Sequence, residues 1–137
     1  TGGGGTGGTP PPTITRGEAA TFLRQASFGP TRAEIDRVVA GGYAAWIDQQ
    51  LARPASLQAP ALRALGRAPT QDDRLDLWFR HAVQGEDQLR QRVAFALSQI
   101  IVVSQVGALQ NLPNATADFY DLLARGAFGN YRDLLRD

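Results

Sequence analysis

The sequence predicts an all-α fold, and three observations carry that prediction. Hydroxyl residues followed three positions later by an acid open several apolar stretches, as in Thr15 with Glu18 and Thr31 with Glu34, and this is the capping box of helix N-termini. Glycines stand where these stretches should end, because glycine accepts the left-handed conformation of helix C-termini. No segment alternates apolar and polar residues for long enough to indicate a strand. We therefore expect an irregular bundle of about seven helices.

The elements follow in order along the chain. Residues 1–13 contain only glycine, threonine and proline, so they are predicted to form an extended tether. A phosphate-binding glycine loop would need a preceding strand and a following lysine, which this stretch lacks. Helical periodicity and capping residues place the helices of a single domain, residues 14–137, which we expect to be the N-terminal fragment of a longer domain. The helices span 15–27, 32–40, 43–53, 71–84, 87–105, 115–125 and 131–137, and a short turn near 60–65 could add an eighth.

The segment 87–105 is the predicted central helix of the bundle. Leu89, Val93, Ala96, Leu97 and Ile100 fall on one face of a helical wheel, as a core-facing stripe requires. Phe95 and Val102 fall on the opposite face. A helix that is apolar on both sides needs neighbours all around it, so we expect other helices to enclose this one.

Composition excludes several kinds of chemistry. The chain has no Cys, Met or Lys and one His, and its 14 basic residues, all arginine, balance 13 acidic ones for a net charge of +1. A thiol nucleophile, a Cys-ligated zinc site, a Schiff base and a P-loop lysine are therefore ruled out. The near-neutral charge argues against a nucleic-acid partner. No apolar run is long enough to span a membrane. We expect no cofactor.

The residues that could suggest catalysis or metal binding have simpler structural explanations. His81 stands near the end of the helix 71–84, one turn after Trp78, where the helix dipole favours a cation. The acids Asp72, Asp73 and Asp76 could form a metal site, but they lie in the first turns of that helix, where carboxylates serve as caps. Asp118 and Asp121 could act as an acid and base couple. On a helix whose core side is Phe119, Leu122 and Leu123, we expect instead that they face solvent.

Arginines and aromatic residues are predicted to be structural. Arg90 and Arg92 flank the apolar stripe of the central helix on its two edges. A guanidinium enclosed there must find a carboxylate or helix-end carbonyls, so we predict structural ion pairs, with a substrate-anion contact as the alternative. Core packing is the expectation for the aromatic residues Tyr43, Trp46, Trp78, Phe79 and Tyr131. In the last helix, Tyr131, Leu134 and Leu135 form an apolar stripe that we predict to be an interface.

Four blocks of sequence carry a resemblance to a known family. They are FLRQASFGPTRAEIDRV (22–38), GGYAAWIDQQL (41–51), QLRQRVAFALSQIIVVS (88–104) and FYDLLARGAFGNYRDLL (119–135). In this order they resemble the opening of the bacterial domain-of-unknown-function family numbered 1800. The resemblance implies an exported protein at the periplasmic or outer surface of a bacterium, with the tether as a spacer and a lipid anchor upstream of Thr1. It implies no particular reaction.

Two functional hypotheses follow. The first is a non-catalytic helical part of an exported, surface-associated protein, which acts in structural assembly or docks a protein partner or the remainder of its own chain. The second is the scaffold half of a secreted enzyme, such as a hydrolase, whose active site lies beyond Asp137. We expect no catalytic, cofactor-binding or metal-binding residue within the chain.

Overall fold

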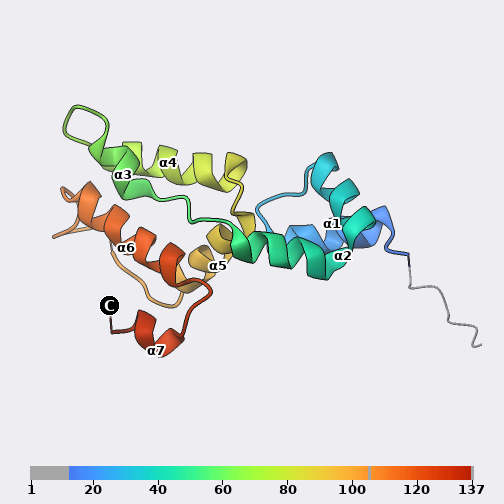
Figure 1. The fold of residues 1–137 in the computed structure, drawn as a ribbon. Coiled ribbons are helices and arrows are strands. Elements are labelled where there is room, and N and C mark those ends of the chain that lie inside the picture. Colours follow the sequence, from blue (N-terminus) through green and yellow to red (C-terminus); the bar gives the residue numbers. More distant parts are fainter. Residues whose placement is uncertain (1–12, 105, 137) are drawn as a thin grey trace, which may run out of the picture.

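The computed structural model describes residues 13–104 and 106–136, and these residues form seven helices and no strand (Figure 1). The predicted all-α class is therefore confirmed. The tether predicted over residues 1–13 lies outside the described residues except for Thr13. No described helix has the length and apolar character needed to cross a lipid bilayer.

The helix boundaries agree with the sequence in most places. The elements are α1 (Arg16–Ala26), α2 (Arg32–Ala52), α3 (Gln58–Arg63), α4 (Gln71–Gln84), α5 (Gln88–Ser98), α6 (Pro113–Gly126) and α7 (Tyr131–Leu134). The two helices predicted over 32–40 and 43–53 are the two halves of α2, which meet at a kink. Gly42 forms the kink with a φ of 85°, a conformation that glycine adopts without steric cost. The short turn near 60–65 belongs to α3.

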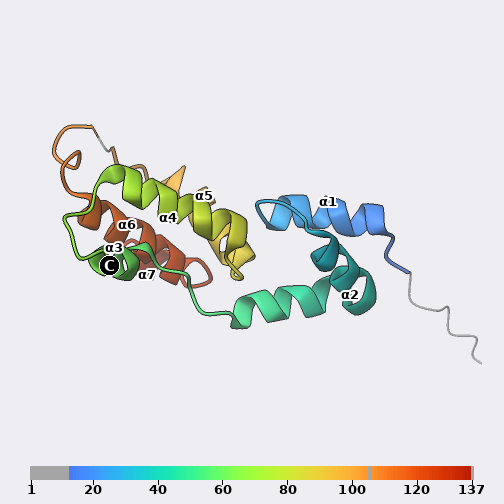
Figure 2. The same cartoon turned by 90° about the horizontal axis from the view of Figure 1, so that it is seen from above.

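The helices gather into two groups that α5 joins. At one end, α1 packs against α2, whereas α3, α4, α6 and α7 lie at the other (Figures 1 and 2). Helix α5 contacts α1, α2, α4 and α6, so its predicted central position is correct. The core is divided accordingly, because one apolar cluster surrounds Leu23 and Trp46 and two smaller ones surround Leu123 and Leu62.

The central helix is shorter than predicted, and only part of its predicted stripe packs against neighbours, since Leu89 and Leu97 do so but Ala96 is exposed. It ends at Ser98, and Ile100 and Val102 beyond it are exposed, the latter by 75%. Its buried positions are Gln91, Ala94 and Ser98. The two small side chains stand one turn apart and let α6 approach closely, while the glutamine is buried because its amide is hydrogen-bonded. A count of apolar residues misses such a face.

Local caps fix the starts of three helices. Thr15 and Glu18 form the predicted capping box at α1, and Thr70 with Asp73 does the same at α4. At α2, Thr31 accepts a hydrogen bond from the backbone N–H of Glu34, but the Glu34 carboxylate turns elsewhere. The Glu34 side chain lies in the candidate functional site.

Candidate functional site

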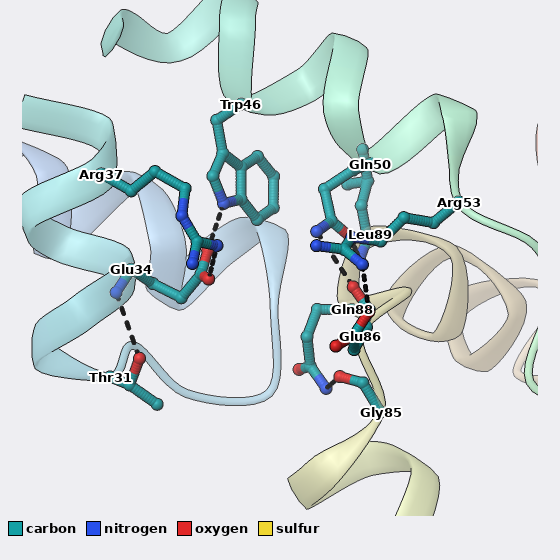
Figure 3. A network of polar contacts seen from close by, with 10 residues as sticks. All are labelled: Thr31, Glu34, Arg37, Trp46, Gln50, Arg53, Gly85, Glu86, Gln88 and Leu89. Atoms are coloured by element: carbon teal, nitrogen blue, oxygen red, sulfur yellow. Dashed lines mark hydrogen bonds and ion pairs between the residues drawn. The ribbon is translucent and has the colours of Figure 1, made fainter. Parts of the chain in front are cut away.

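A polar cleft lies between α2 and the turn that connects α4 to α5 (Figure 3). Its volume is about 230 Å³, and its walls come from the loop before α2, from α2 itself and from residues 83–88. The first half of α2 supplies Glu34 and Arg37, and the second half supplies Trp46, Gln50 and Arg53. The kink at residue 42 brings these two sets of side chains to the same cleft.

The Glu34 carboxylate connects the two halves of α2. It accepts a hydrogen bond from the indole Nε1 of Trp46 at 2.6 Å and forms an ion pair with Arg37. Trp46 is buried, and a buried indole N–H needs an acceptor. The need for this acceptor explains why the Glu34 carboxylate turns away from the N-terminus of α2 and does not complete the capping box predicted from sequence.

On the opposite side of the cleft, two glutamine side-chain amides form hydrogen bonds with backbone groups of neighbouring segments. Gln50 donates to the carbonyl oxygen of Glu86 at 3.1 Å and accepts from the backbone N–H of Leu89 at 3.1 Å. Gln88 accepts from the backbone N–H of Phe28 at 3.2 Å and donates to the carbonyl oxygen of Gly85 at 2.8 Å. Gln50 therefore ties α2 to residues 86–89, and Gln88 ties the loop before α2 to the end of α4.

The charges of the cleft are already paired with one another. Glu34 pairs with Arg37, and Arg53 pairs with Glu86. A general acid or base must have a lone pair or proton free for the substrate, and here the carboxylates are engaged by cations. The arrangement therefore acts as a structural joint between the two groups of helices.

A second carboxylate, that of Asp87, organises the start of α5. It is buried, and it accepts hydrogen bonds from the backbone N–H of Ser56 at 2.8 Å, from the Ser56 hydroxyl at 2.6 Å and from the amide of Gln91 at 3.0 Å. Burial by itself raises the pKa of Asp87, but these hydrogen bonds outweigh it and the net pKa is lowered. The ionised form is therefore the stabilising one.

We expect Asp87→Asn to reduce stability at pH 7 by about 1–2 kcal/mol, and by less near pH 3. The folded-state pKa of Asp87 lies below the ordinary value of 3.8. Its contribution is thus complete above that pH and is lost as the pH falls through the folded-state value. Thermal melts of the wild type and the variant across this range measure the difference. Asp48→Asn, at an exposed position, is the control, and a difference that does not change with pH would contradict the prediction.

Asp118 and Asp121, predicted to share a solvent face of α6, have different environments. Asp118 is exposed and forms an ion pair with Arg63. Asp121 is only 2% exposed, and its two oxygens accept hydrogen bonds from the backbone N–H groups of Gln58 at 2.7 Å and Ala59 at 2.9 Å. Burial raises the pKa of Asp121, although these two donors act in the opposite direction. The prediction for Asp121 was therefore wrong, because its carboxylate caps α3 across the fold.

The remaining candidate acids and the histidine do not form a common site. Asp73 closes the capping box of α4 and pairs with Arg67, whose hydrogen bonds lower the Asp73 pKa. Asp72 and Asp76 are exposed. His81 is half-buried, and burial lowers its pKa, so the ring is neutral at pH 7 rather than the cation that the helix end would favour. Residues 13–104 and 106–136 contain no group of three potential metal ligands.

Arg90 bonds to helix-end carbonyls. Its Nη1 donates to the carbonyl oxygen of Ala124 at 3.1 Å, and its Nη2 donates to that of Arg53 at 3.3 Å. Its guanidinium also lies 4.4 Å from the ring centre of Phe128. Arg90 takes part in none of the ion pairs of the described residues. Carbonyl oxygens at the ends of α2 and α6, which carry partial negative charge, take the place of the predicted carboxylate.

Arg92 is placed over aromatic rings. Its guanidinium lies 5.4 Å from the ring centre of Phe28 and 6.0 Å from that of Phe95. It too is absent from the ion pairs of the described part of the chain. Arg90 therefore contacts other elements through carbonyls and a ring face, and Arg92 through ring faces, rather than through the predicted carboxylates.

The predicted interface of the last helix is divided by burial. Tyr131 and Leu135 are exposed, whereas Leu134 is buried against the cluster around Leu123. The reason is Gly126, since its missing side chain leaves the space that Leu134 fills. Leu134 is therefore a core residue, and only Tyr131 and Leu135 remain on the surface.

An apolar stripe on α4, which we call the α4 stripe, was not recognised from the sequence. It consists of Leu75, Phe79 and Val83, which are 38%, 58% and 75% exposed. Core packing was the expectation for Phe79, so its exposure is a correction. The spacing of four residues was the available signal, because such residues share one face of a helix.

The α4 stripe borders a cluster of aromatic rings. Trp78 contacts Phe79, Phe28 and Phe95 with ring centres 4.9, 5.7 and 5.8 Å apart. These rings come from α4, α5 and the loop before α2, so they hold the exposed stripe on a rigid support. The sequence gives no signal for this cluster, since its members lie far apart along the chain.

The chain is an all-α domain with a polar joint, formed by the paired side chains of the cleft, between its two groups of helices. It also carries the exposed apolar stripe on α4. The model of the family DUF1800, described as a protein of unknown function, matches residues 21–137. The chain belongs to this family, which confirms the resemblance seen in the sequence. No curated protein and no solved structure matches the chain significantly.

Proposed function

We propose that this chain is a non-catalytic docking module that binds an amphipathic helix of a partner protein along α4. The observation that carries the proposal is the α4 stripe, whose side chains become more exposed along the helix, up to 75% at Val83. Large apolar side chains aligned on a surface cost free energy in water, and contact with another apolar surface recovers it.

The shape and charge of the stripe suit a helix. Residues four apart form a ridge that packs into the grooves of a second helix. Asp72, Asp76 and Arg80 are exposed and follow the same spacing beside the stripe, so they form a polar rim along one edge. The two carboxylates favour a partner helix with basic residues beside its apolar side.

The proposed setting is the exported, surface-associated one that the family resemblance implies. The glycine, threonine and proline composition of residues 1–13 supports it, because such a segment suits a spacer between a domain and an attachment point. Docking of a partner at the periplasmic or outer surface of a bacterium is the corresponding role.

We expect Phe79→Ser to weaken partner binding by about tenfold or more while changing stability by at most about 1 kcal/mol. Phe79 is more than half exposed in the free chain, so its removal takes little from the fold, but it would be central to the contact. Thermal melts measure the change in stability.

Site-specific photo-crosslinking in the producing cell tests the contact with the partner. A benzophenone amino acid at position 79 should capture one protein, with the linked residue on the apolar side of a helix. The same group at Leu65, an exposed apolar residue outside the stripe, is the matched control. Equal labelling from both positions, or a linked segment that is not an apolar helix, would contradict the proposal.

A further inference from the structure

A small pocket lies beneath the N-terminal end of the α4 stripe, between α4, α5 and α6. Its volume is about 160 Å³, and its walls include the rings of Trp78, Phe95 and Tyr120 together with Ser98. Arg74 is the charged residue of this lining. The pocket is thus an aromatic enclosure with one cation.

Arg74 is one of the most deeply buried large side chains of the described residues, with 2% exposure. Its Nε donates to the amide oxygen of Gln71 at 3.1 Å, and its guanidinium lies 5.0 Å from the ring centre of Tyr120. Within residues 13–104 and 106–136, no acceptor bonds its two terminal nitrogens and no carboxylate pairs with it.

A buried guanidinium of this kind weakens the fold. Burial lowers the pKa of Arg74, with only Tyr120 acting against it, because an enclosed guanidinium loses part of its hydration. An apolar side chain of similar length would pack there at lower free energy. Groups that reduce stability in this way are typical of binding sites, where a ligand supplies the missing interaction.

We propose that this pocket binds a carboxylate carried on an aromatic or flat apolar body. The two free nitrogens of a guanidinium match the two oxygens of a carboxylate. A cavity of about 150 Å³ accommodates one benzene ring, so a single ring would fit among Trp78, Phe95 and Tyr120. This inference goes beyond the docking role. The two sites share Leu75, but the pocket takes a small carboxylate whereas docking needs a partner protein, so each is tested separately.

Calorimetric titration of the chain with 3-phenylpropionate tests the proposal, with 3-phenylpropanamide as the matched neutral ligand. We expect saturable binding of the acid and binding at least tenfold weaker for the amide. Bound acid should also shift the NMR signal of the Arg74 Nε–H and raise the melting temperature. Equal binding of acid and amide, or no binding of either, would overturn the proposal.

Two variants assign the effect to the pocket. Arg74→Met should abolish the difference between acid and amide and should raise the melting temperature of the free chain. Arg63→Met removes an exposed arginine that is paired with Asp118, so it should retain the preference for the acid. Loss of the preference in both variants would overturn the assignment to Arg74. Because the comparison of acid with amide uses the wild type, it remains decisive if Arg74→Met fails to fold.

Two further ligands identify the source of the carboxylate. The peptide acetyl-Ala-Ala-Phe with a free carboxyl terminus represents a chain end, and its amidated form is the control. Tighter binding of the free-terminus peptide than of 3-phenylpropionate would assign the site to a protein terminus. Tighter binding of 3-phenylpropionate would assign it to a small acid. Both results require the carboxylate and support the proposal.

Discussion

Replacement of Asp121 by alanine is expected to destabilise the domain by about 3 kcal/mol. The carboxylate is buried and accepts the backbone N–H groups of Gln58 and Ala59 at the start of α3. Leu57, at the N-cap position of α3, supplies no side-chain hydrogen bond of its own. Alanine would leave two buried donors without acceptors, and each such donor costs about 1–3 kcal/mol. Chemical denaturation measures the total.

The same helix offers a matched control for this prediction. Asp118 lies one turn earlier in α6 and forms an exposed ion pair with Arg63, and exposed pairs contribute about 0–1 kcal/mol. Asp118→Ala should therefore unfold almost as the wild type does. Hydrogen exchange should show that Asp121→Ala exposes the first turn of α3 before the rest. Similar unfolding curves for the two variants would contradict the cap.

This contrast shows which caps a sequence can predict. Thr15 with Glu18 and Thr70 with Asp73 were recognised because cap and helix are three residues apart. Asp121 caps a helix that begins more than sixty positions earlier, and Gln50 bonds to the start of α5, 39 positions later. Such partners come together only by tertiary packing, so no local pattern records them.

The central helix shows a second limit of sequence patterns. Its position between the two groups of helices follows from its apolar character, and the prediction was correct. Leu97 packs against the cluster around Leu123 as its apolar character suggests, but the fully buried positions of α5 are small or polar, because close approach and satisfied amides matter there as well as hydrophobicity. The apolar residues beyond Ser98 then lie on the surface instead of extending the helix.

The candidate sites differ in what the sequence could have shown. The α4 stripe was readable as three large apolar residues at intervals of four, next to an acidic edge. The environment of Arg74 could not be recognised from the sequence, since its pocket combines side chains from three helices. In an arginine-rich chain, a buried arginine without a carboxylate partner is recognised only once the helices around it are in place.

Replacement of Gly85 by alanine is expected to destabilise the domain by about 2–3 kcal/mol. Gly85 ends α4, and its φ of −62° suits any residue, so the effect would be steric and local. A methyl group there would overlap the backbone carbonyl oxygen of His81 and press on the Asp87 carboxylate. Because a helix backbone cannot rotate away as a side chain can, the turn itself must move.

Movement of that turn would disturb the polar joint as well as the end of α4. Gln88 donates to the carbonyl oxygen of Gly85, and Gln50 donates to that of Glu86, so both hydrogen bonds depend on the turn. Gly29→Ala is the control, since a methyl group at Gly29 meets no atom within 4 Å. Denaturation should separate the two variants, with wild-type stability for Gly29→Ala and early exposure of the Trp46 indole in Gly85→Ala. Equal stability of Gly85→Ala and Gly29→Ala would mean that the turn yields to the added methyl group, and it would contradict this prediction.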